Sequence, residues 1–319
     1  MKKRLFHIKP LILTAFVILF ISGCQGVATA PNAPADVTGN EPPQSEPSVF
    51  ADGYIMGIQE DRSAILVTKY VKSESQEYVD PIWFLIDQQT SFETSQNVTF
   101  TQDQLQLGQR VNVTHSGPVM ESYPVRTTAQ TIEYLPPTQD ILYASNGLAS
   151  AIRDYLQTTQ VAGAVSLASA ISQIDYDPEF ELWNVAIVSA ESIDKPHIAQ
   201  IDGKTGQYVF KSNKAFRIFA PEPNNVVGTS FTVVGRARVF EATLQYRLED
   251  GHNILAEGFT TATEGGPAWG DFEIQLEYER PTSPSLTLIL YESSAEDGQP
   301  IHELLLPLKV DPELIGDAP

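Results

Sequence analysis

Apolar and polar residues alternate along the last third of the chain, as in strands that bury one face and expose the other. Every second residue is apolar in the runs 244–248, 272–278 and 286–290. The dipeptide Asp250-Gly251 follows the first run and is typical of a tight hairpin turn. Because each strand has only one apolar face, we predict a two-sheet β-sandwich over residues 215–312.

Short β-rich runs also fill residues 49–136. They alternate with turns and lie at 53–58, 64–70, 82–86, 109–114 and 127–134. About five short strands in a segment of this length are typical of a small barrel. We therefore predict an OB-like β domain here.

Residues 137–213 have a different pattern. Apolar residues at spacings of three and four over 147–157 predict an amphipathic helix with polar residues on its outer side. Strands are expected at 182–188 and 197–201, and the second of these runs into the hairpin turn Asp202-Gly203. The segment is thus predicted to be a small α+β unit, which makes the chain mainly β and multidomain.

The N-terminus has the pattern of a secretory signal peptide. Four basic residues precede an apolar run at 11–21, and Ser22, Gly23 and Cys24 follow it. The run is too short to cross a bilayer core of about 30 Å as a helix, which argues against a transmembrane anchor. We predict a signal peptide over residues 1–23.

The residues that end this leader, Ile21-Ser22-Gly23-Cys24, resemble a bacterial lipobox. The resemblance implies that the Cys24 thiol takes a diacylglycerol, that the leader is removed and that the new amino group is acylated. Several acyl chains hold a protein firmly on a membrane. The alternative is an ordinary signal cleaved near Ala28 or Ala30, which would leave an unused thiol. Lipidation is the preferred prediction.

Residues 24–48 contain mostly Pro, Ala, Ser, Thr, Asn and Glu, so they are expected to form a disordered tether. We therefore predict an extracytoplasmic protein that its lipid anchors to the cell membrane. Gln25 after the cysteine would also permit sorting to the outer membrane of a two-membrane cell.

Charge narrows the choice of partners. The chain has 20 Lys and Arg against 40 Asp and Glu, and a net charge of −20. Removal of the leader takes away four basic residues and no acidic one, so the mature charge is near −24. Such a chain repels nucleic acids and anionic headgroups, which leaves the lipid as the membrane contact. With one cysteine there is no disulfide framework.

No catalytic or metal-binding constellation is found. Ser192-Ile193-Asp194-Lys195 and Lys204-Thr205-Gly206 match two motifs of penicillin-recognising enzymes, but they lie only nine residues apart, and Pro196 disfavours a helical Lys195. Histidines are scattered singly, and residues 175–186 lack the glycine and glutamate of an EF-hand. A looser calcium site near 175–179 stays open. We predict no enzyme activity, no cofactor and no metal.

The sandwich segment contains family signatures. They are VGRARVFEA at 234–242, WG.F at 269–272 and YE.SA.DG at 291–298. In this order they closely resemble the immunoglobulin-like domain of bacterial sporulation and spore-germination proteins. The resemblance implies an immunoglobulin-like sandwich and a setting in sporulation, germination or envelope assembly. Trp269 is expected to be a core residue.

Two further segments show resemblances. L.LGQ.V.V at 105–113 with G.V.ESYP at 117–124 resembles an uncharacterised family of small bacterial lipoproteins and secreted proteins, which implies a fold but no activity. The predicted helix and strands with D..TG at 202–206 are similar to PepSY domains of envelope proteins. The turn chemistry of Asp-Gly explains this last pattern without homology.

Four charged residues of the sandwich fall near what we expect to be two adjacent strands: Arg236, Arg238, Glu241 and Arg247. They form either cross-strand ion pairs on the solvent face or a partner-binding face. Our functional prediction is a non-catalytic lipoprotein that binds an envelope protein or cell-wall partner. The alternative is a PepSY-like regulator or inhibitor of an envelope peptidase or hydrolase.

Overall fold

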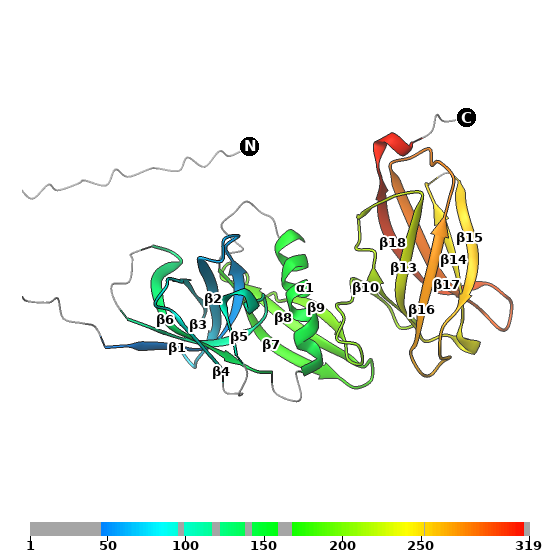
Figure 1. Cartoon of the computed structure of the whole chain (residues 1–319). Helices are drawn as coiled ribbons and strands as arrows, with labels where there is room; N and C mark the ends of the chain where they lie inside the picture. Colours follow the sequence, from blue (N-terminus) through cyan, green and yellow to red (C-terminus); the bar gives the residue numbers. More distant parts are fainter. Residues whose placement is uncertain are drawn as a thin grey trace, which may run out of the picture. The chain divides into compact units, whose positions relative to one another are not determined.

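The structure is a computed structural model that describes residues 46–94, 99–116, 122–137, 142–158, 168–251 and 253–315. The predicted signal peptide, Cys24 and the tether up to residue 45 lie outside the described residues. All named elements belong to the unit Gln44–Pro319. They are mostly strands (Figure 1), which confirms the mainly β, multidomain fold.

The first sheet has six strands. They are β1 (Ser48–Ile58), β2 (Ala64–Lys72), β3 (Glu77–Leu85), β4 (Ser91–Thr94), β5 (Arg110–His115) and β6 (Val125–Leu135), with the 3₁₀ turn η1 (Gln102–Gln104) before β5. Antiparallel pairs join β3, β2, β1, β5 and β6 in that order, and a parallel pair between β3 and β6 closes the ring. A closed five-stranded ring is the barrel expected for an OB-like domain. The short β4 pairs with the free part of the β6 edge.

The second module contains the one α-helix among the described residues, α1 (Leu142–Thr158), and the antiparallel sheet of β7 (Ser169–Asp177), β8 (Leu182–Ser189) and β9 (His197–Asp202). The predicted helix and two predicted strands are present. Strand β7 was not predicted from the sequence, because a bulge between Ile171 and Gln173 interrupts the alternation of apolar residues.

The barrel and this module share an apolar cluster. Met56 of β1 and Leu66 of β2 lie in the same buried group as Leu148 and Ile152 of α1 and Ile201 of β9. A separate cluster fills the barrel itself. The two predicted segments therefore bury apolar side chains against each other as well as within themselves.

The last module is a sandwich of two sheets. One sheet has the order β10 (Lys211–Ser212), β11 (Phe216–Ala220), β13 (Ser230–Ala237), β16 (Gly270–Glu277). The other has the order β12 (Val226–Val227), β18 (Pro300–Val310), β17 (Ser285–Ser293), β14 (Thr243–Glu249), β15 (Ile254–Thr261). The 3₁₀ turn η4 (Phe240–Ala242) connects β13 of the first sheet to β14 of the second, and η5 (Pro312–Leu314) follows β18.

The core of the sandwich contains the alternating residues that the sequence identified. Leu244 and Leu248 are buried there with apolar residues of β16, β17 and β18. Hairpins join β14 to β15 and β17 to β18. Gly251, in the turn between β14 and β15, has a φ of 89°, a value that favours glycine.

No helix in the described part of the chain is long and apolar enough to cross a membrane.

Candidate functional site

The strands on which the predicted site residues Arg236 and Arg247 lie belong to two different sheets, which corrects the expectation of two adjacent strands. Arg236 lies in β13, which pairs with β11 and β16. Arg247 lies in β14, which pairs with β15 and β17. The reason is η4, where the chain crosses from one sheet to the other instead of forming a hairpin. Arg238 follows the end of β13, and Glu241 is the middle residue of η4.

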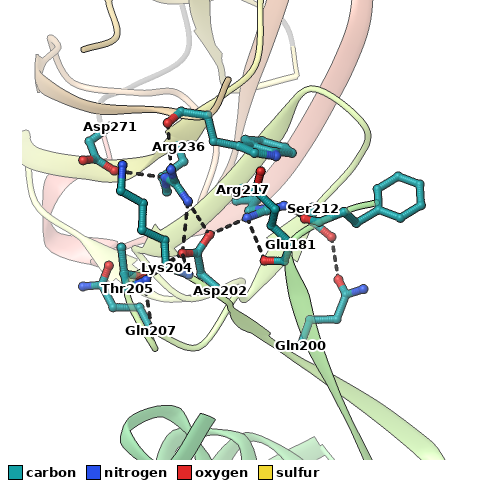
Figure 2. A network of polar contacts seen from close by, with 12 residues as sticks. Glu181, Gln200, Asp202, Lys204, Thr205, Gln207, Ser212, Arg217, Arg236 and Asp271 are labelled. Atoms are coloured by element: carbon teal, nitrogen blue, oxygen red, sulfur yellow. Dashed lines mark hydrogen bonds and ion pairs between the residues drawn. The ribbon is translucent and has the colours of Figure 1, made fainter. Parts of the chain in front are cut away.

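Arg236 is only 1% exposed and is engaged inside the molecule. Its Nη1 donates to both Asp202 carboxylate oxygens at 3.1 Å, and its Nη2 donates to the Trp269 carbonyl at 2.7 Å. Its Nε lies 3.1 Å from Asp271 Oδ1 (Figure 2). In this structure Arg236 therefore holds two modules together and is not presented at a surface.

Asp202 is fully buried and accepts hydrogen bonds from two directions. Its Oδ1 accepts from the backbone N–H and the hydroxyl of Thr205 at 2.9 and 3.0 Å, which shapes the turn after β9. Its Oδ2 accepts from Arg217 Nη1 (Figure 2). Burial alone would raise the pKa of Asp202, but the Thr205 N–H and the two arginines outweigh it and lower the pKa below its ordinary value.

Arg217 completes this junction, which we define as Asp202, Arg217, Arg236 and Trp269. The Arg217 Cζ lies 3.7 Å from the centre of the Trp269 ring, and its Nη2 donates to the carbonyl of Phe180. Burial lowers the pKa of Arg217, while the hydrogen bond to Asp202 opposes that shift. Trp269 is buried as predicted, but it packs under arginines rather than in the main apolar cluster. The four residues of the junction include no nucleophile, and their contacts connect the α+β module to the sandwich.

A second feature lies on the outer face of the five-stranded sheet. Phe259 of β15 is 73% exposed and stands opposite Gln245 of β14, which stands opposite Tyr291 of β17. In the next row Arg247 stands opposite Ile289, which stands opposite the exposed Leu305. Directly paired residues share a face of a sheet. We call this surface the Phe259 face; it comprises Gln245, Arg247, Phe259, Tyr291 and Leu305, together with Ile289, which is buried.

The Phe259 face continues into a pocket of about 270 Å³. We call it the corner pocket; it is lined by Phe240, Glu241, Thr243, Gln245, Glu292, Ser293 and Ala295. Phe240 is 63% exposed at its rim, and Gln245 belongs to both features. The residues of two sequence signatures, VFEA and YE.SA, thus meet in one place although about 50 residues separate them.

The backbone of the corner pocket is strained. Glu241 and Ala242 have φ values of 53° and 58°, a region that costs a residue with a side chain about 1–3 kcal/mol. Glu292 holds this turn, because its Oε1 accepts from the Phe240 N–H at 2.8 Å and its Oε2 lies 2.9 Å from His302 Nδ1. Strain that the surroundings maintain is often found at functional sites.

Some residues of these features were predicted from the sequence, but the contacts that connect them were not. Glu241 and Arg247 were identified, and the structure brings them to one side of the sandwich. Phe259 was missed, although a phenylalanine at an outward position of an alternating strand is a signal that could have found it. Asp202 was recognised only as a turn residue, because its arginine partners lie 15 and 34 residues away.

Comparisons with known proteins agree with two of the resemblances. Residues 216–299 match the family described as the immunoglobulin-like domain of bacterial spore germination. Residues 52–136 match the family described as a protein of unknown function (DUF3221). Each match covers one module, so the chain combines an immunoglobulin-like domain of that type with a DUF3221 domain.

No curated protein matches the chain. Among solved structures, the extracellular domains of a one component system and of a hybrid two component system from B. thetaiotaomicron are similar at 11% identity, each with a TM-score of 0.14. The similar regions cover 83% and 80% of this chain but only 36% of each of those chains. At these TM-scores neither structure informs the fold or the function.

Within the described residues, no group of three or more His, Cys, Asp or Glu side chains is arranged to hold a metal ion.

Proposed function

We propose that the protein is a non-catalytic, membrane-tethered binding protein of the bacterial cell envelope, and that its immunoglobulin-like domain binds a protein partner on the Phe259 face and corner pocket. The observation that carries this proposal is that exposed aromatic side chains lie beside the corner pocket. The backbone of this pocket is strained, and its lining comes from two of the family signatures. The spore-germination description of the matched family supports a setting in germination or sporulation.

The composition of the Phe259 face favours a protein as the partner. Aromatic residues and arginine are enriched at protein interfaces, and here Phe259, Tyr291 and Arg247 lie on adjacent strands. Glutamates surround them: Glu241 lines the pocket, and Glu257 stands opposite Arg247. Since the whole chain is also strongly acidic, the partner surface is expected to carry an apolar centre and basic residues at its edge.

The test compares matched variants of the mature chain. Phe259→Ala and Phe240→Ala should each reduce capture of the partner from envelope extracts, and weaken its purified complex at least tenfold, because exposed aromatics at interface centres act as hot spots. Val226→Ala is the control, since Val226 is 63% exposed on β12 at the opposite edge of the same sheet. If all three variants bind equally well, the proposed face is wrong.

Anchoring has its own test. Cys24 is the one cysteine of the sequence and ends the lipobox-like run. Cys24→Ala should release the protein from the membrane fraction or stop removal of the leader, which fractionation and intact-mass measurement detect. Cys24→Ser is a conservative second variant with the same expectation, because a hydroxyl does not replace the thiol in the predicted modification. Unchanged membrane association and processing would contradict the anchor.

A second candidate function is regulation of an envelope peptidase or hydrolase by a PepSY-like module. The observation that favours it is the order of α1 followed by the antiparallel sheet of β7, β8 and β9. Because this module shares a core with the barrel, the test uses the whole mature chain in assays of envelope peptidases. No change in any peptidase rate would remove this candidate.

A further inference from the structure

The sheet of β7, β8 and β9 has one face that α1 does not cover. Val185 and Ile201 point into the apolar cluster that contains α1. The residues that alternate with them, Asn184 and Gln200, stand opposite each other and therefore point to the other face. We call this the polar face of the sheet. It ends at Asp202, the residue that the two arginines of the junction cover.

A hollow of about 290 Å³ lies on the polar face. It is lined by Asp177, Phe180, Leu182, Asn184, Gln200, Ser212 and Asn213. These side chains supply one carboxylate, three amides, one hydroxyl and one aromatic ring, and none is a lysine or arginine. Pockets for whole small ligands begin at about 300 Å³, so this hollow has room for about one ring-sized unit.

Some of the polar groups are paired and some are available. Gln200 Nε2 donates to Asn184 Oδ1 at 3.4 Å, and Gln200 Oε1 accepts from the Ser212 hydroxyl at 2.7 Å (Figure 2). Asp177 Oδ1 accepts from two backbone N–H groups of its own turn. Among the described residues, Asn184 Nδ2 and Asp177 Oδ2 have no partner, which leaves a donor and an acceptor in the same hollow.

Hydrogen bonds within the protein hold the residues that line the hollow in place before any ligand binds. Arg217 donates to the carbonyls of Phe180 and Glu181 and so holds the turn that contains Phe180 and Asp177. Asn213 is held from both ends: its Oδ1 accepts from two backbone N–H groups, and its Nδ2 donates to the His302 carbonyl at 2.8 Å. A site with fixed walls loses little conformational entropy when a ligand binds.

The geometry points to a binding site for a neutral, polyhydroxylated ligand, namely one sugar unit of a glycan strand. A sugar ring offers hydroxyls that can donate to Asp177 and accept from Asn184, and an apolar face that can lie against the Phe180 ring. An anion would meet the Asp177 carboxylate without a compensating cation. None of the residues that line this hollow belongs to the Phe259 face or the corner pocket, so the inference is independent of the proposed protein partner.

The test is a titration of the mature chain with a soluble tetramer of N-acetylglucosamine, followed by calorimetry or by NMR of the Asn and Gln side-chain amides. Binding is expected, with shifts at Asn184 and Gln200. Asn184→Ala and Phe180→Ala should each weaken binding at least tenfold. Asn225→Ala, an exposed amide outside the hollow, should leave it unchanged.

Three results would overturn the inference. One is no detectable binding of the sugar tetramer at about 10 mM, which is ten times a dissociation constant of about 1 mM, the value expected for a weak sugar site. The second is binding that Asn184→Ala and Phe180→Ala, folded as shown by circular dichroism, do not weaken. The third is binding of a neutral peptide in the hollow without binding of the sugar. Phe259→Ala should bind the sugar normally, which separates this site from the proposed protein-binding face.

Discussion

At the scale of single residues, Asp202 combines a local and a distant function. It shapes its own turn through Thr205, and it also neutralises Arg217 and Arg236, which come from strands of another module. A complete buried ion pair adds little net stability, but removal of one member is costly because it leaves a charge buried without its partner. The junction should therefore be sensitive to loss of its single carboxylate.

The first prediction is that Asp202→Asn lowers the free energy of unfolding by about 3–5 kcal/mol, because Arg217 and Arg236 lose the one buried carboxylate that they share. Urea unfolding at pH 7 measures this. Asp271→Asn is the matched control: its side chain is 56% exposed and also pairs with Arg236, so its loss should cost less than about 1 kcal/mol. If both variants lower the free energy of unfolding equally, burial of Asp202 does not increase its contribution to stability.

The second prediction concerns pH. The folded structure lowers the pKa of Asp202, so the stability that this carboxylate contributes is complete above its unfolded pKa of about 3.9 and is lost as the pH falls through the folded pKa. The difference in unfolding free energy between the wild type and Asp202→Asn should thus be constant near neutral pH and shrink below about pH 4. Unfolding curves between pH 3 and 7 test this, and a constant difference would contradict it.

At the scale of elements, periodic patterns predicted strands well and connections badly. The alternating runs of the sandwich became β14, β16 and β17, with the expected faces buried. The alternation failed in β7, where a bulge shifts the faces, and the pairing failed at η4. Alternation identifies which side of a strand is apolar, but it contains no information about which strand lies beside it.

The third prediction is at helix α1. Alanine is a better helix former than glycine by about 1 kcal/mol, so propensity alone predicts that Gly147→Ala stabilises the protein. In the structure, a Cβ at Gly147 would lie 2.8 Å from Ile201 Cγ2 and 2.9 Å from the Gly206 carbonyl oxygen. We therefore expect Gly147→Ala to lower the melting temperature, as calorimetry can measure.

The control for that prediction is Gln157→Ala in the exposed last turn of α1, which should be neutral or slightly stabilising. A higher melting temperature for Gly147→Ala would mean that the helix moves away from β9 at little cost.

At the scale of the whole molecule, the modules are joined by contacts of two kinds. An apolar cluster joins the barrel to the α+β module, and the charged junction joins the α+β module to the sandwich. Neighbouring residues of β2 show the division: Leu66 packs in the shared cluster, whereas Val67 packs in the core of the barrel.

The fourth prediction uses this pair. Leu66→Ala should cost about 2–5 kcal/mol and increase amide hydrogen exchange in α1 as well as in the barrel, because Leu66 packs in the cluster that holds α1. Val67→Ala should increase exchange mainly in the barrel strands. Hydrogen-exchange mass spectrometry separates the two patterns. If Leu66→Ala leaves α1 fully protected, the shared cluster does not couple the modules.

Short linear patterns were enough to predict the alternating strands, the helix near 147–157, the hairpin turns and the family signatures. It also singled out Cys24, Glu241 and Arg247 as candidate residues. These depend on spacings of two to four residues or on short motifs, so a linear pattern contains them.

Three features become visible only in the folded chain: Arg236 is buried against Asp202, Glu241 and Phe240 line one pocket with Glu292, and Asn184 and Gln200 form the polar face of their sheet. The partners in each case come from different strands or modules. Which strands pair, and which faces become covered, depends on packing of the whole chain, and no local spacing of residues specifies it.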